Sequence, residues 1–508
     1  MSWKSHLAHK GFACVAGLVG LPVIVFTMVG LASAQVTGTA TIAPNPQVDQ
    51  IFATWDKSDS PGCALAVSRE GQIIYKRGYG MADLDHHIGI DPATTVFHAA
   101  SLAKQLTAMA IVLLKIQGKL NLDDDAHNFI PELANMRQQP TISQLLHHTS
   151  GIRDQWLLAT LAGWRMSDDT ITLDGVLDFV GRMKSLNFTP GSKFSYSNTN
   201  YTLAGKIVKE RSGQSLADFV REQIFLPLNM QNSTITETHG QVVKNRAYGY
   251  RGTYPNFEIR MPNYDLTGPT NFLTTAEDLL RWAHNFESKT VGGDDAHSAM
   301  QSRPTGVVDG FSDRFHYGLG IYVEKENGRK ILEHDGRDAG YRSHLILFPN
   351  DRKLTVALLC NVLLPNQSRT YKLVRDVAAV YLNEPLDSSS SAPAACQRDR
   401  SPVDLTKYLG RYYNEEIDTV YEVGLSPDGQ SLTITRNKYA AITLTGGSDD
   451  IFSMENFSGP VLPCSSVKFN KDPQGKVTEF RMNARDTGLL KDFPFEKCED
   501  NRCPPKRP

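Results

Sequence analysis

The chain has 508 residues, of which 41% are hydrophobic and 21% are charged. At about 150 residues per domain, this length predicts roughly three domains with a large buried core. The 53 basic and 55 acidic residues nearly cancel, so the chain lacks the basic surplus of nucleic-acid-binding proteins, and we expect no nucleic-acid partner. The composition also excludes a wholly disordered chain.

Residues 1–34 are predicted to be a secretory signal peptide. Lys4 and Lys10 precede an uncharged run over residues 11–31, and the Ala-Ser-Ala of residues 32–34 is a small-residue cleavage site. We therefore expect a secreted or periplasmic protein with no stable membrane insertion. Because the run is long enough to cross a bilayer core of about 30 Å, an uncleaved N-terminal membrane anchor is the alternative.

Cysteine usage agrees with export. Six of the seven cysteines follow the predicted cleavage site, and an even number permits disulfides. Cys63 and Cys360 lie in apolar, strand-like runs, where the sequence does not distinguish a disulfide from two small buried side chains. The other four crowd the last quarter of the chain, where three complete pairings are possible: Cys396, Cys464, Cys498 and Cys503.

The predicted elements begin with a hairpin and a helix. Residues 63–67 and 72–75 are β-rich runs separated by a Ser-Arg-Glu-Gly turn. Apolar residues at helical spacing then predict a buried helix over 101–116, with Gly118 as its stop signal. Later helical patterns cover 142–148, 201–211, 216–224, 275–286 and 371–382, and strands return at 316–324, 341–348 and 354–360. Early strands, a helical middle and late strands predict an α+β layout in which both ends share one sheet.

A second domain is predicted after a linker. Residues 384–403 are rich in Ser, Pro and Ala, which is typical of an exposed linker after a first domain over 35–383. Beyond the linker, apolar and polar residues alternate in several short runs separated by turns. We therefore predict a small all-β barrel or sandwich over 404–508.

The first candidate for chemistry is Ser101-Leu102-Ala103-Lys104. The i,i+3 spacing puts the serine hydroxyl and the lysine amine on one helical face. Serine needs a nearby base to become a nucleophile, and a lysine in an apolar site can lose its proton. The spacing alone is common, and a second copy at 465–468 alternates like a strand, so its two ends would point to opposite faces.

The second candidate is Tyr196-Ser197-Asn198, in a loop before a predicted helix. Tyrosine can exchange protons, and asparagine can hold a substrate carbonyl or orient the lysine. The triplet is not rare, and taken singly it is more often a packed aromatic beside a turn residue.

The third candidate is His334-Asp335-Gly336, which is followed by Arg337 and a strand-forming run. The small Gly336 would let a substrate lie against an edge strand, and a backbone N–H just after it could join that of Ser101 as an oxyanion hole. The alternative interpretation is a simple turn before the strand.

Two histidine pairs, at residues 86–87 and 147–148, invite a metal interpretation. The second pair lies at a predicted helix end, where histidine complements the helix dipole. The cysteines have no metal-ligand spacing, and there is no Gly-rich phosphate loop. We expect neither a metal nor a cofactor.

Taken in this order, the Ser-x-x-Lys, Tyr-x-Asn and Lys/His-x-Gly motifs resemble those of the serine β-lactamase and penicillin-binding protein superfamily. The chain looks most like the class C β-lactamase-related branch, which also holds esterases, D-aminopeptidases and DD-peptidases. The resemblance covers about residues 48–382 and includes the stretches around the motifs, 145–152, 190–198, 275–279 and 334–349. It implies an antiparallel sheet of five or more strands flanked by helices, with an all-helical lobe beside it.

The resemblance also implies residue roles in acyl transfer through an acyl-enzyme that water then hydrolyses. The implied catalytic residues are Ser101 as nucleophile, Lys104 as its base and Tyr196 as proton shuttle. The implied substrate-binding residues are Asn198, His334, Gly336 and Arg337, with the backbone N–H groups of Ser101 and Arg337 as the oxyanion hole.

One departure from the family pattern bears on the substrate. Many penicillin-recognising members carry lysine and a hydroxyl residue where this chain has His334 and Asp335, and a neutral histidine weakens the anchor for a carboxylate. Arg337 or Arg342 would have to compensate. We therefore predict a serine hydrolase of small-molecule or peptide substrates that cleaves ester, amide or peptide bonds. The alternatives are a β-lactamase or DD-peptidase, and a non-enzymatic envelope-binding protein that keeps the fold.

Overall fold

The computed structural model describes residues 44–307, 310–363, 369–387, 404–436, 440–455, 465–484, 490–499 and 503. The predicted signal peptide, most of the predicted linker, Cys396 and Cys464 lie outside the described residues. Within the described ranges, no helix has both the length and the apolar character that a membrane crossing requires.

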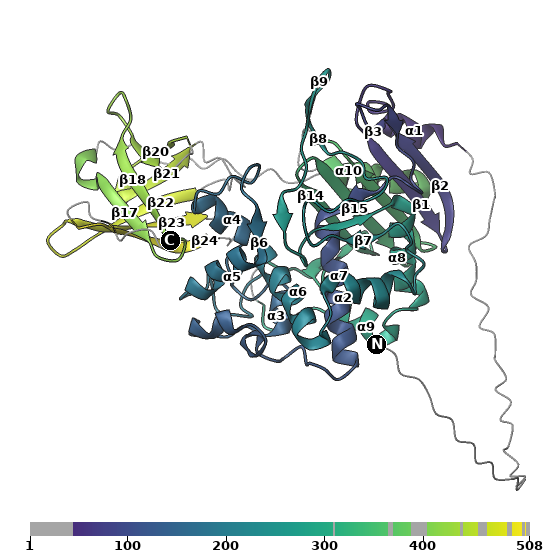
Figure 1. Cartoon of the computed structure of the whole chain (residues 1–508), viewed down its shortest axis with the longest axis horizontal. Helices are drawn as coiled ribbons and strands as arrows, with labels where there is room; N and C mark the ends of the chain where they lie inside the picture. Colours follow the sequence, from purple (N-terminus) through teal and green to yellow (C-terminus); the bar gives the residue numbers. More distant parts are fainter. Residues whose placement is uncertain are drawn as a thin grey trace, which may run out of the picture. The chain divides into compact units, whose positions relative to one another are not determined.

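A seven-stranded antiparallel sheet forms the centre of the region before the predicted linker (Figure 1), with the order β12-β13-β14-β15-β16-β1-β2. Its strands are β1 (Cys63–Arg69), β2 (Gln72–Tyr79), β12 (Phe315–Tyr317), β13 (Tyr322–Glu326), β14 (Arg329–Asp338), β15 (Tyr341–Phe348) and β16 (Leu354–Cys360). Because β1 pairs with β16, the early hairpin and the late strands share one sheet, as predicted.

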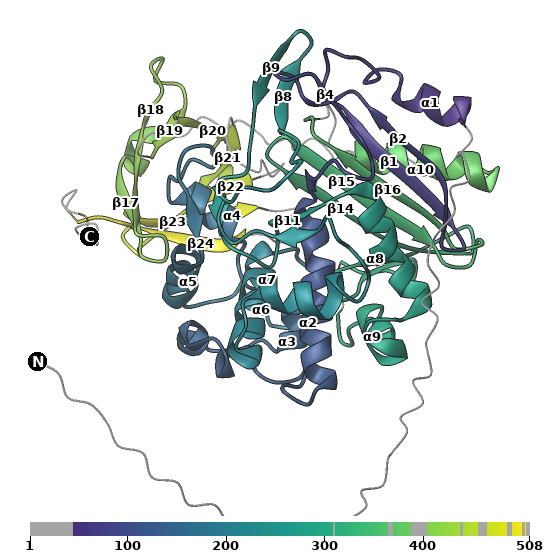
Figure 2. The ribbon, with the colours of Figure 1, turned by 45° about the vertical axis from the view of Figure 1, so that its right-hand side comes forward.

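Helices flank the sheet and build a helical lobe in which α2, α3, α6 and α7 pack together (Figure 2). They are α1 (Pro46–Phe52), α2 (Ala103–Ile116), α3 (Ile142–Leu146), α4 (Gln155–Leu161), α5 (Leu173–Arg182), α6 (Asn198–Ser212), α7 (Leu216–Val220), α8 (Ala276–Ser288), α9 (Gly293–Met300) and α10 (Arg369–Leu382). Helices α4 and α9 were not predicted, because helices of 7 and 8 residues show little periodicity. Helix α5 was not predicted because Gly175 and Gly181 lower the helix propensity.

Short strands pair outside the main sheet: β3 (Met81–Asp83), β4 (Ile88–Gly89), β5 (Phe97–His98), β6 (Ile171–Thr172), β7 (Thr234–Ile235), β8 (Tyr250–Thr253), β9 (Asn256–Ile259), β10 (Tyr264–Asp265) and β11 (Phe272–Thr274). The sheet β5-β11-β7 lies next to the start of α2, since β11 contacts the 3-10 turn before that helix.

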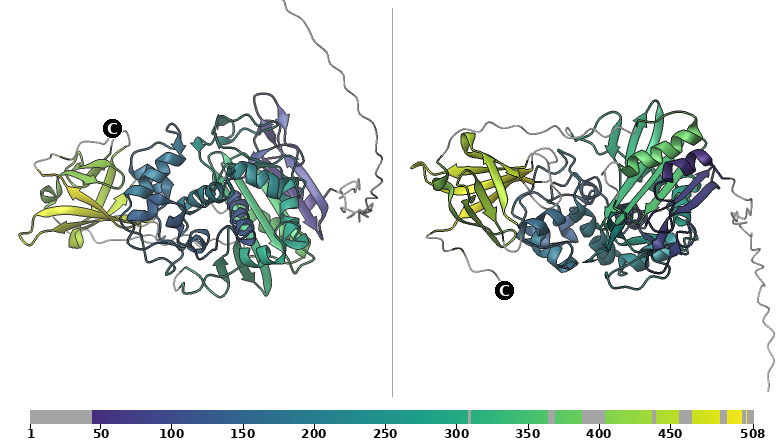
Figure 3. Two further views of the ribbon diagram at one scale, coloured as in Figure 1. Left: turned by 60° about the horizontal axis from the view of Figure 1, so that its bottom comes forward. Right: turned by 90° about the horizontal axis from the view of Figure 1, so that it is seen from above.

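The main sheet separates two hydrophobic cores, because alternate side chains of a strand point to opposite faces. Cys63, Leu65 and Val67 of β1 pack with α1 and α10. The alanines between them, Ala64 and Ala66, belong to the core that contains α2 and α8. Figure 3 shows this layering, with α1 in purple and α10 in green on one side of the sheet. Burial on both faces explains why β1 and β16 are almost continuously apolar.

Two sequence predictions differ from the structure in this sheet. The run 316–324 forms two strands, β12 and β13, because Gly320 takes a left-handed turn between them with a φ of 76°. The motif His334-Asp335-Gly336 lies within β14 and not in a turn before β15. The sequence did not predict a strand here because Glu, His, Asp and Gly have low strand propensity. The strand forms because it pairs with β15.

The C-terminal region is a closed barrel, which decides between the predicted barrel and sandwich. Its eight strands are β17 (Gly410–Asn414), β18 (Thr419–Leu425), β19 (Leu432–Thr435), β20 (Ile442–Gly446), β21 (Ile451–Glu455), β22 (Ser465–Lys471), β23 (Val477–Ala484) and β24 (Leu490–Lys497). Pairing of β17 with β24 closes the ring, and stacked aromatic side chains such as Tyr421, Phe480 and Phe495 fill its interior. The second Ser-x-x-Lys copy lies on strand β22, as predicted.

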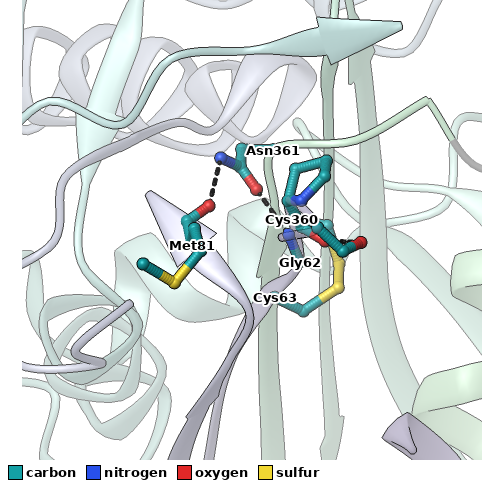
Figure 4. The surroundings of a disulfide bond; sticks show 7 residues. Gly62, Cys63, Met81, Cys360 and Asn361 are labelled. Atoms are coloured by element: carbon teal, nitrogen blue, oxygen red, sulfur yellow. Dashed lines mark hydrogen bonds between the residues drawn. A yellow bond between two sulfur atoms is a disulfide. The ribbon is translucent and has the colours of Figure 1, made fainter. Parts of the chain in front are cut away.

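Cys63 and Cys360 form a disulfide between the paired strands β1 and β16 (Figure 4). The amide of Asn361 supports the same end of the sheet, because it accepts from the Gly62 N–H at 2.8 Å and donates to the Met81 carbonyl at 3.0 Å. A second disulfide joins Cys498 to Cys503 after β24. The sequence left both pairings open.

Candidate active site

Ser101 lies in a 3-10 turn, η1 (Ala100–Leu102), which leads directly into α2. Ala100, the residue before it, has a φ of 49°. Residues with a Cβ rarely adopt this left-handed region, so the backbone is strained directly before the serine. Such strain persists only where the surroundings enforce it, and Ser101 itself stays partly exposed.

The central sheet enforces this conformation. Ser343 of β15 donates its hydroxyl to the Ala99 carbonyl at 2.7 Å. Opposite it on β14, a Cβ on Gly336 would lie 2.5 Å from the same carbonyl oxygen, so only glycine allows this close approach. The strand motif and the serine motif are therefore packed directly against each other.

Lys104 lies one helical turn after Ser101 and is fully buried. Its Nζ donates to three oxygens, each at 2.9 Å: Ser101 Oγ, Asn198 Oδ1 and the Pro269 carbonyl. The helical spacing predicted from the sequence thus places the amine in hydrogen-bond contact with the serine.

Burial lowers the pKa of Lys104 to about 7, because the ammonium form loses hydration. Three carboxylates, those of Asp154, Asp338 and Asp335, oppose this shift. Burial lowers the pKa values of the neighbouring His148 and His334 imidazoles, and the Lys104 charge lowers them further. Near neutral pH a large share of Lys104 is therefore uncharged and able to accept the Ser101 proton.

Tyr196 completes the group around the serine. Its ring centroid lies 4.9 Å from Lys104 Nζ. Burial raises the pKa of the Tyr196 phenol well above its usual value, and its hydrogen bond with Ser101 opposes that shift. The phenol therefore stays protonated, and it can donate a proton to a leaving group.

Asn198 is held by Asp154, a residue that the sequence analysis did not single out. One oxygen of the buried Asp154 carboxylate accepts from the Asn198 N–H at 2.7 Å and from its side-chain amide at 2.8 Å. The other oxygen caps α4 by accepting from the Trp156 and Leu157 N–H groups. One carboxylate thus caps the N-termini of α4 and α6, where negative charge is favourable.

His148 packs against the Tyr-x-Asn segment. Its ring centroid lies 4.2 Å from that of Tyr196, and its Nδ1 accepts from the Ser197 N–H at 3.2 Å. Burial lowers its pKa well below the usual value, so the ring is neutral. The stretch 145–152 of the family resemblance was the available signal for His148, which the sequence analysis had assigned only to a helix end.

His334 is buried and is not a cation at neutral pH. Its Nε2 bonds with the Tyr317 hydroxyl at 2.9 Å, and its Nδ1 with the Asp335 carbonyl at 2.6 Å. Burial lowers its pKa to about 4. Its ring is only 1% exposed, so it supports β14 from within the protein.

Asp335 and Arg337 flank Gly336 and remain accessible, with side chains 36% and 46% exposed and Arg337 Nε 3.6 Å from Asp335 Oδ2. The next residue, Asp338, anchors the end of β14. Its buried carboxylate accepts from His98 Nε2 at 2.9 Å and Thr270 Oγ1 at 2.7 Å, and also from the Tyr264 hydroxyl. These bonds fix the backbone around Arg337.

All seven motif residues thus lie on four segments: η1, α2, the segment that leads into α6 together with the first residue of that helix, and β14. β13 pairs with β14 only as far as Glu333, and the rest of β14 contacts η1.

Within the described part of the chain, no group of three or more His, Cys, Asp or Glu residues is arranged to hold a metal.

Comparisons with known proteins bear on the family and the fold. The family model named Beta-lactamase matches residues 48–381. A D-aminopeptidase of Gluconobacter oxydans is 26% identical over 380 residues, which cover 73% of this chain and 66% of that protein. A D-aminopeptidase of Brucella ovis is 27% identical over 299 residues, which cover 59% and 56%. The chain thus spans 56 to 66% of the length of these curated relatives.

The fold also matches a solved structure. The octameric penicillin-binding protein homologue from Pyrococcus abyssi superposes with a TM-score of 0.58 at 20% identity, over 89% of this chain and 98% of that chain. At 20% identity this similarity is evidence for the fold alone. Because it covers 89% of this chain, the similarity includes part of the barrel.

Proposed function

Because the chain belongs to the Beta-lactamase family, we propose that it is a serine hydrolase that forms an acyl-enzyme at Ser101. The observation that carries the proposal is the 2.9 Å contact between Lys104 Nζ and Ser101 Oγ, made by an amine whose pKa is lowered to about 7. This pair is a nucleophile with its base already in hydrogen-bond reach.

The proposed reaction starts when Ser101 Oγ attacks the substrate carbonyl carbon and Lys104 accepts the hydroxyl proton. The backbone N–H groups of Ser101 and Arg337 stabilise the oxyanion. Tyr196 gives its phenolic proton to the leaving nitrogen or oxygen as that bond breaks, and the Lys104 ammonium returns a proton to the phenolate. Water then attacks the ester at Ser101, with Lys104 again as base, and restores the serine.

We propose amides, peptides and esters of D-amino acids with a free amino group as the substrates. The relatives named D-aminopeptidase support the configuration. Asp335 lies beside Gly336, is 36% exposed and has Arg337 Nε at 3.6 Å, and it is the carboxylate that we propose attracts the substrate ammonium. His334 is both neutral and buried, so it offers no positive charge to a substrate carboxylate such as that of a β-lactam.

Probe labelling tests the nucleophile. A fluorophosphonate probe is expected to label the purified protein, and Ser101→Ala is expected to abolish labelling. Ser233→Ala, which changes a serine bonded to Asp278 outside the site, is the matched control and should label normally. Undiminished labelling of Ser101→Ala would rule out the proposed nucleophile.

Substrate profiling tests the class. We expect kcat/KM for D-alanine p-nitroanilide and for a short-chain nitrophenyl ester to exceed that for a chromogenic cephalosporin. Asp335→Asn should raise KM for D-alanine p-nitroanilide by about tenfold and leave KM for its N-acetyl derivative unchanged, since only the free amine meets the carboxylate. A faster cephalosporin rate under matched conditions would instead support a β-lactamase.

We also propose that the protein is exported. Residues 1–34 have the signal-peptide pattern, and disulfides such as Cys63–Cys360 persist mainly in oxidising compartments. Intact mass measurement of the protein from its native host should give a chain that begins at Gln35. A chain that retains Met1 in a membrane fraction would support the uncleaved anchor instead.

A further inference from the structure

Helix α4 connects the barrel to the proposed active site. The helix is only 7 residues long, and its N-cap, Asp154, holds Asn198. A helix leaves its last carbonyl groups without partners in the helix, so a short helix depends on its surroundings at both ends. In this protein, the barrel contacts both ends.

The barrel caps the C-terminal end of α4. Arg436 donates to the Thr160 carbonyl at 2.5 Å, and the Tyr421 hydroxyl donates to the Leu161 carbonyl at 2.8 Å. Both barrel side chains are at most 1% exposed. The guanidinium also places positive charge at the negative end of the helix dipole.

The barrel also holds the residue just before the N-cap. The guanidinium of Arg153 is 1% exposed and lies 3.2 Å from the carboxylate of Glu416, which follows β17. Its Cζ lies 5.3 Å from the ring centroid of Phe493 on β24. A buried guanidinium needs a partner charge, so Arg153 depends on Glu416. Ser185 of the helical lobe supplies two further contacts.

The contacts continue from Arg153 into the site without a gap. The Arg153 carbonyl accepts from the Thr199 hydroxyl at 2.7 Å. Asp154, the next residue, accepts from both amide groups of Asn198. Asn198 in turn accepts from Lys104 Nζ at 2.9 Å. From Glu416 to Lys104, every step is a hydrogen bond or a peptide link.

We infer that the C-terminal barrel positions the active site, with Glu416 and Arg436 as positioning residues that hold the two ends of α4. Held in this way, α4 presents Asp154 to Asn198, and Asn198 holds the Lys104 amine against Ser101. The inference rests on the proposed function, because it assigns to the barrel the alignment of the proposed nucleophile and base.

The chain offers a matched control for Glu416. Its neighbour Glu415 also makes an ion pair from the barrel to the helical lobe, with Lys184 at 2.6 Å, but these side chains are 52% and 74% exposed. Exposed pairs contribute little, and Lys184 is not connected to Asp154 by the contacts above. The comparison of Glu416→Ala with Glu415→Gln therefore separates positioning of the site from attachment of the barrel.

The experiment uses the full-length protein. Glu416→Ala is expected to lower kcat for D-alanine p-nitroanilide about 10- to 100-fold, with KM changed less than about twofold, because misalignment affects the reacting groups. The rate of fluorophosphonate labelling should also reach its half-maximum at a lower pH, since a displaced Asp154 supports the Lys104 ammonium less well. Glu415→Gln should change none of these quantities.

Three further variants make the test independent of a folding failure. Glu416→Gln keeps the side-chain volume but loses the charge of the bond to Arg153, and should show the same shift at smaller size. Arg436→Met should lower kcat, and Arg436→Lys, which restores the positive charge, should recover part of it. Circular dichroism and the thermal midpoint identify any variant that does not fold.

The two proposals fail in distinguishable ways. If folded Glu416→Ala, Glu416→Gln and Arg436→Met keep the wild-type kcat and labelling profile and only the thermal midpoint drops, the barrel merely stabilises the protein and the inference is overturned. If the wild-type protein is not labelled, or Ser101→Ala still is, the proposed function fails instead.

Discussion

Lys104 shows how one residue obtains its chemistry from its surroundings. Burial removes the hydration of the ammonium and lowers its pKa to about 7, while nearby carboxylates hold that pKa up. Its three acceptors fix the amine in place. The balance between burial and the carboxylates, and not the lysine itself, sets the pH at which the proposed base loses its proton.

This balance predicts the pH dependence. Because the base must be uncharged, kcat/KM should rise with pH with an apparent pKa of about 7 and fall about tenfold per pH unit below it. Asp154 raises the pKa of Lys104, so Asp154→Asn should shift this rise to lower pH. Asp178→Asn, on the exposed side of α5, should not. A rise that is unchanged or moves to higher pH in Asp154→Asn would contradict the assignment.

Strand β14 shows how an element brings distant groups together. Near its C-terminal end, Gly336 approaches the backbone before Ser101. The buried His334 bonds with Tyr317, and the last residue, Asp338, anchors the strand. The strand thus aligns the Arg337 backbone beside η1. Its sequence is polar because these contacts need polar groups, which is also why its propensity for strand is low.

The close approach at Gly336 predicts a strong effect of one methyl group. A Cβ there would lie 2.2 Å from Ser343 Oγ and 2.5 Å from the Ala99 carbonyl, so Gly336→Ala must displace β14 or η1. We expect kcat/KM to fall about 100-fold while circular dichroism shows a folded protein. On β18, Gly424→Ala is the control, because the nearest atom would be 3.6 Å away. Equal activity of both variants would show that this contact is not needed.

At the scale of the whole molecule, a late strand of the main sheet pairs with an early one. β1 pairs with β16, and the disulfide Cys63–Cys360 closes a loop with a sequence separation of 297 residues. The helical lobe is inserted within this loop. The closure therefore restrains the unfolded chain strongly, since the entropy lost on closing a loop grows with its length.

Removing this disulfide should lower the stability more than removing the other one. The double substitution Cys63→Ala with Cys360→Ala is expected to lower the free energy of unfolding by about 3 to 5 kcal/mol, and to leave probe labelling of Ser101 intact in the folded protein. Cys498→Ala with Cys503→Ala, whose separation is only 5 residues, should cost about 2 kcal/mol or less. Urea unfolding measures the free energy of unfolding of both double variants. Equal decreases would show that the length of the closed loop does not determine the stabilisation.

The sequence alone predicted those elements whose pattern is local. The helix that carries Ser101 and Lys104, the buried strands β1, β15 and β16, and the alternating strands of the barrel repeat with the period of their own backbone. The spacing in Ser-x-x-Lys placed both side chains on one face for the same reason. The seven motif residues were predicted from their order along the chain together with the family resemblance, and their roles are proposals.

The tertiary structure alone decided what depends on contacts between distant segments. Asp154 and His148 have no local pattern that marks them, because their role comes from Asn198 and Tyr196, some 45 residues further along. The same holds for the Cys63–Cys360 pairing, the closure of the barrel by β17 and β24, and the contacts of Glu416 and Arg436 with α4. A periodic pattern shows which face of a helix or strand is buried. The residues that contact this face come from distant parts of the chain, so only the folded structure shows which they are.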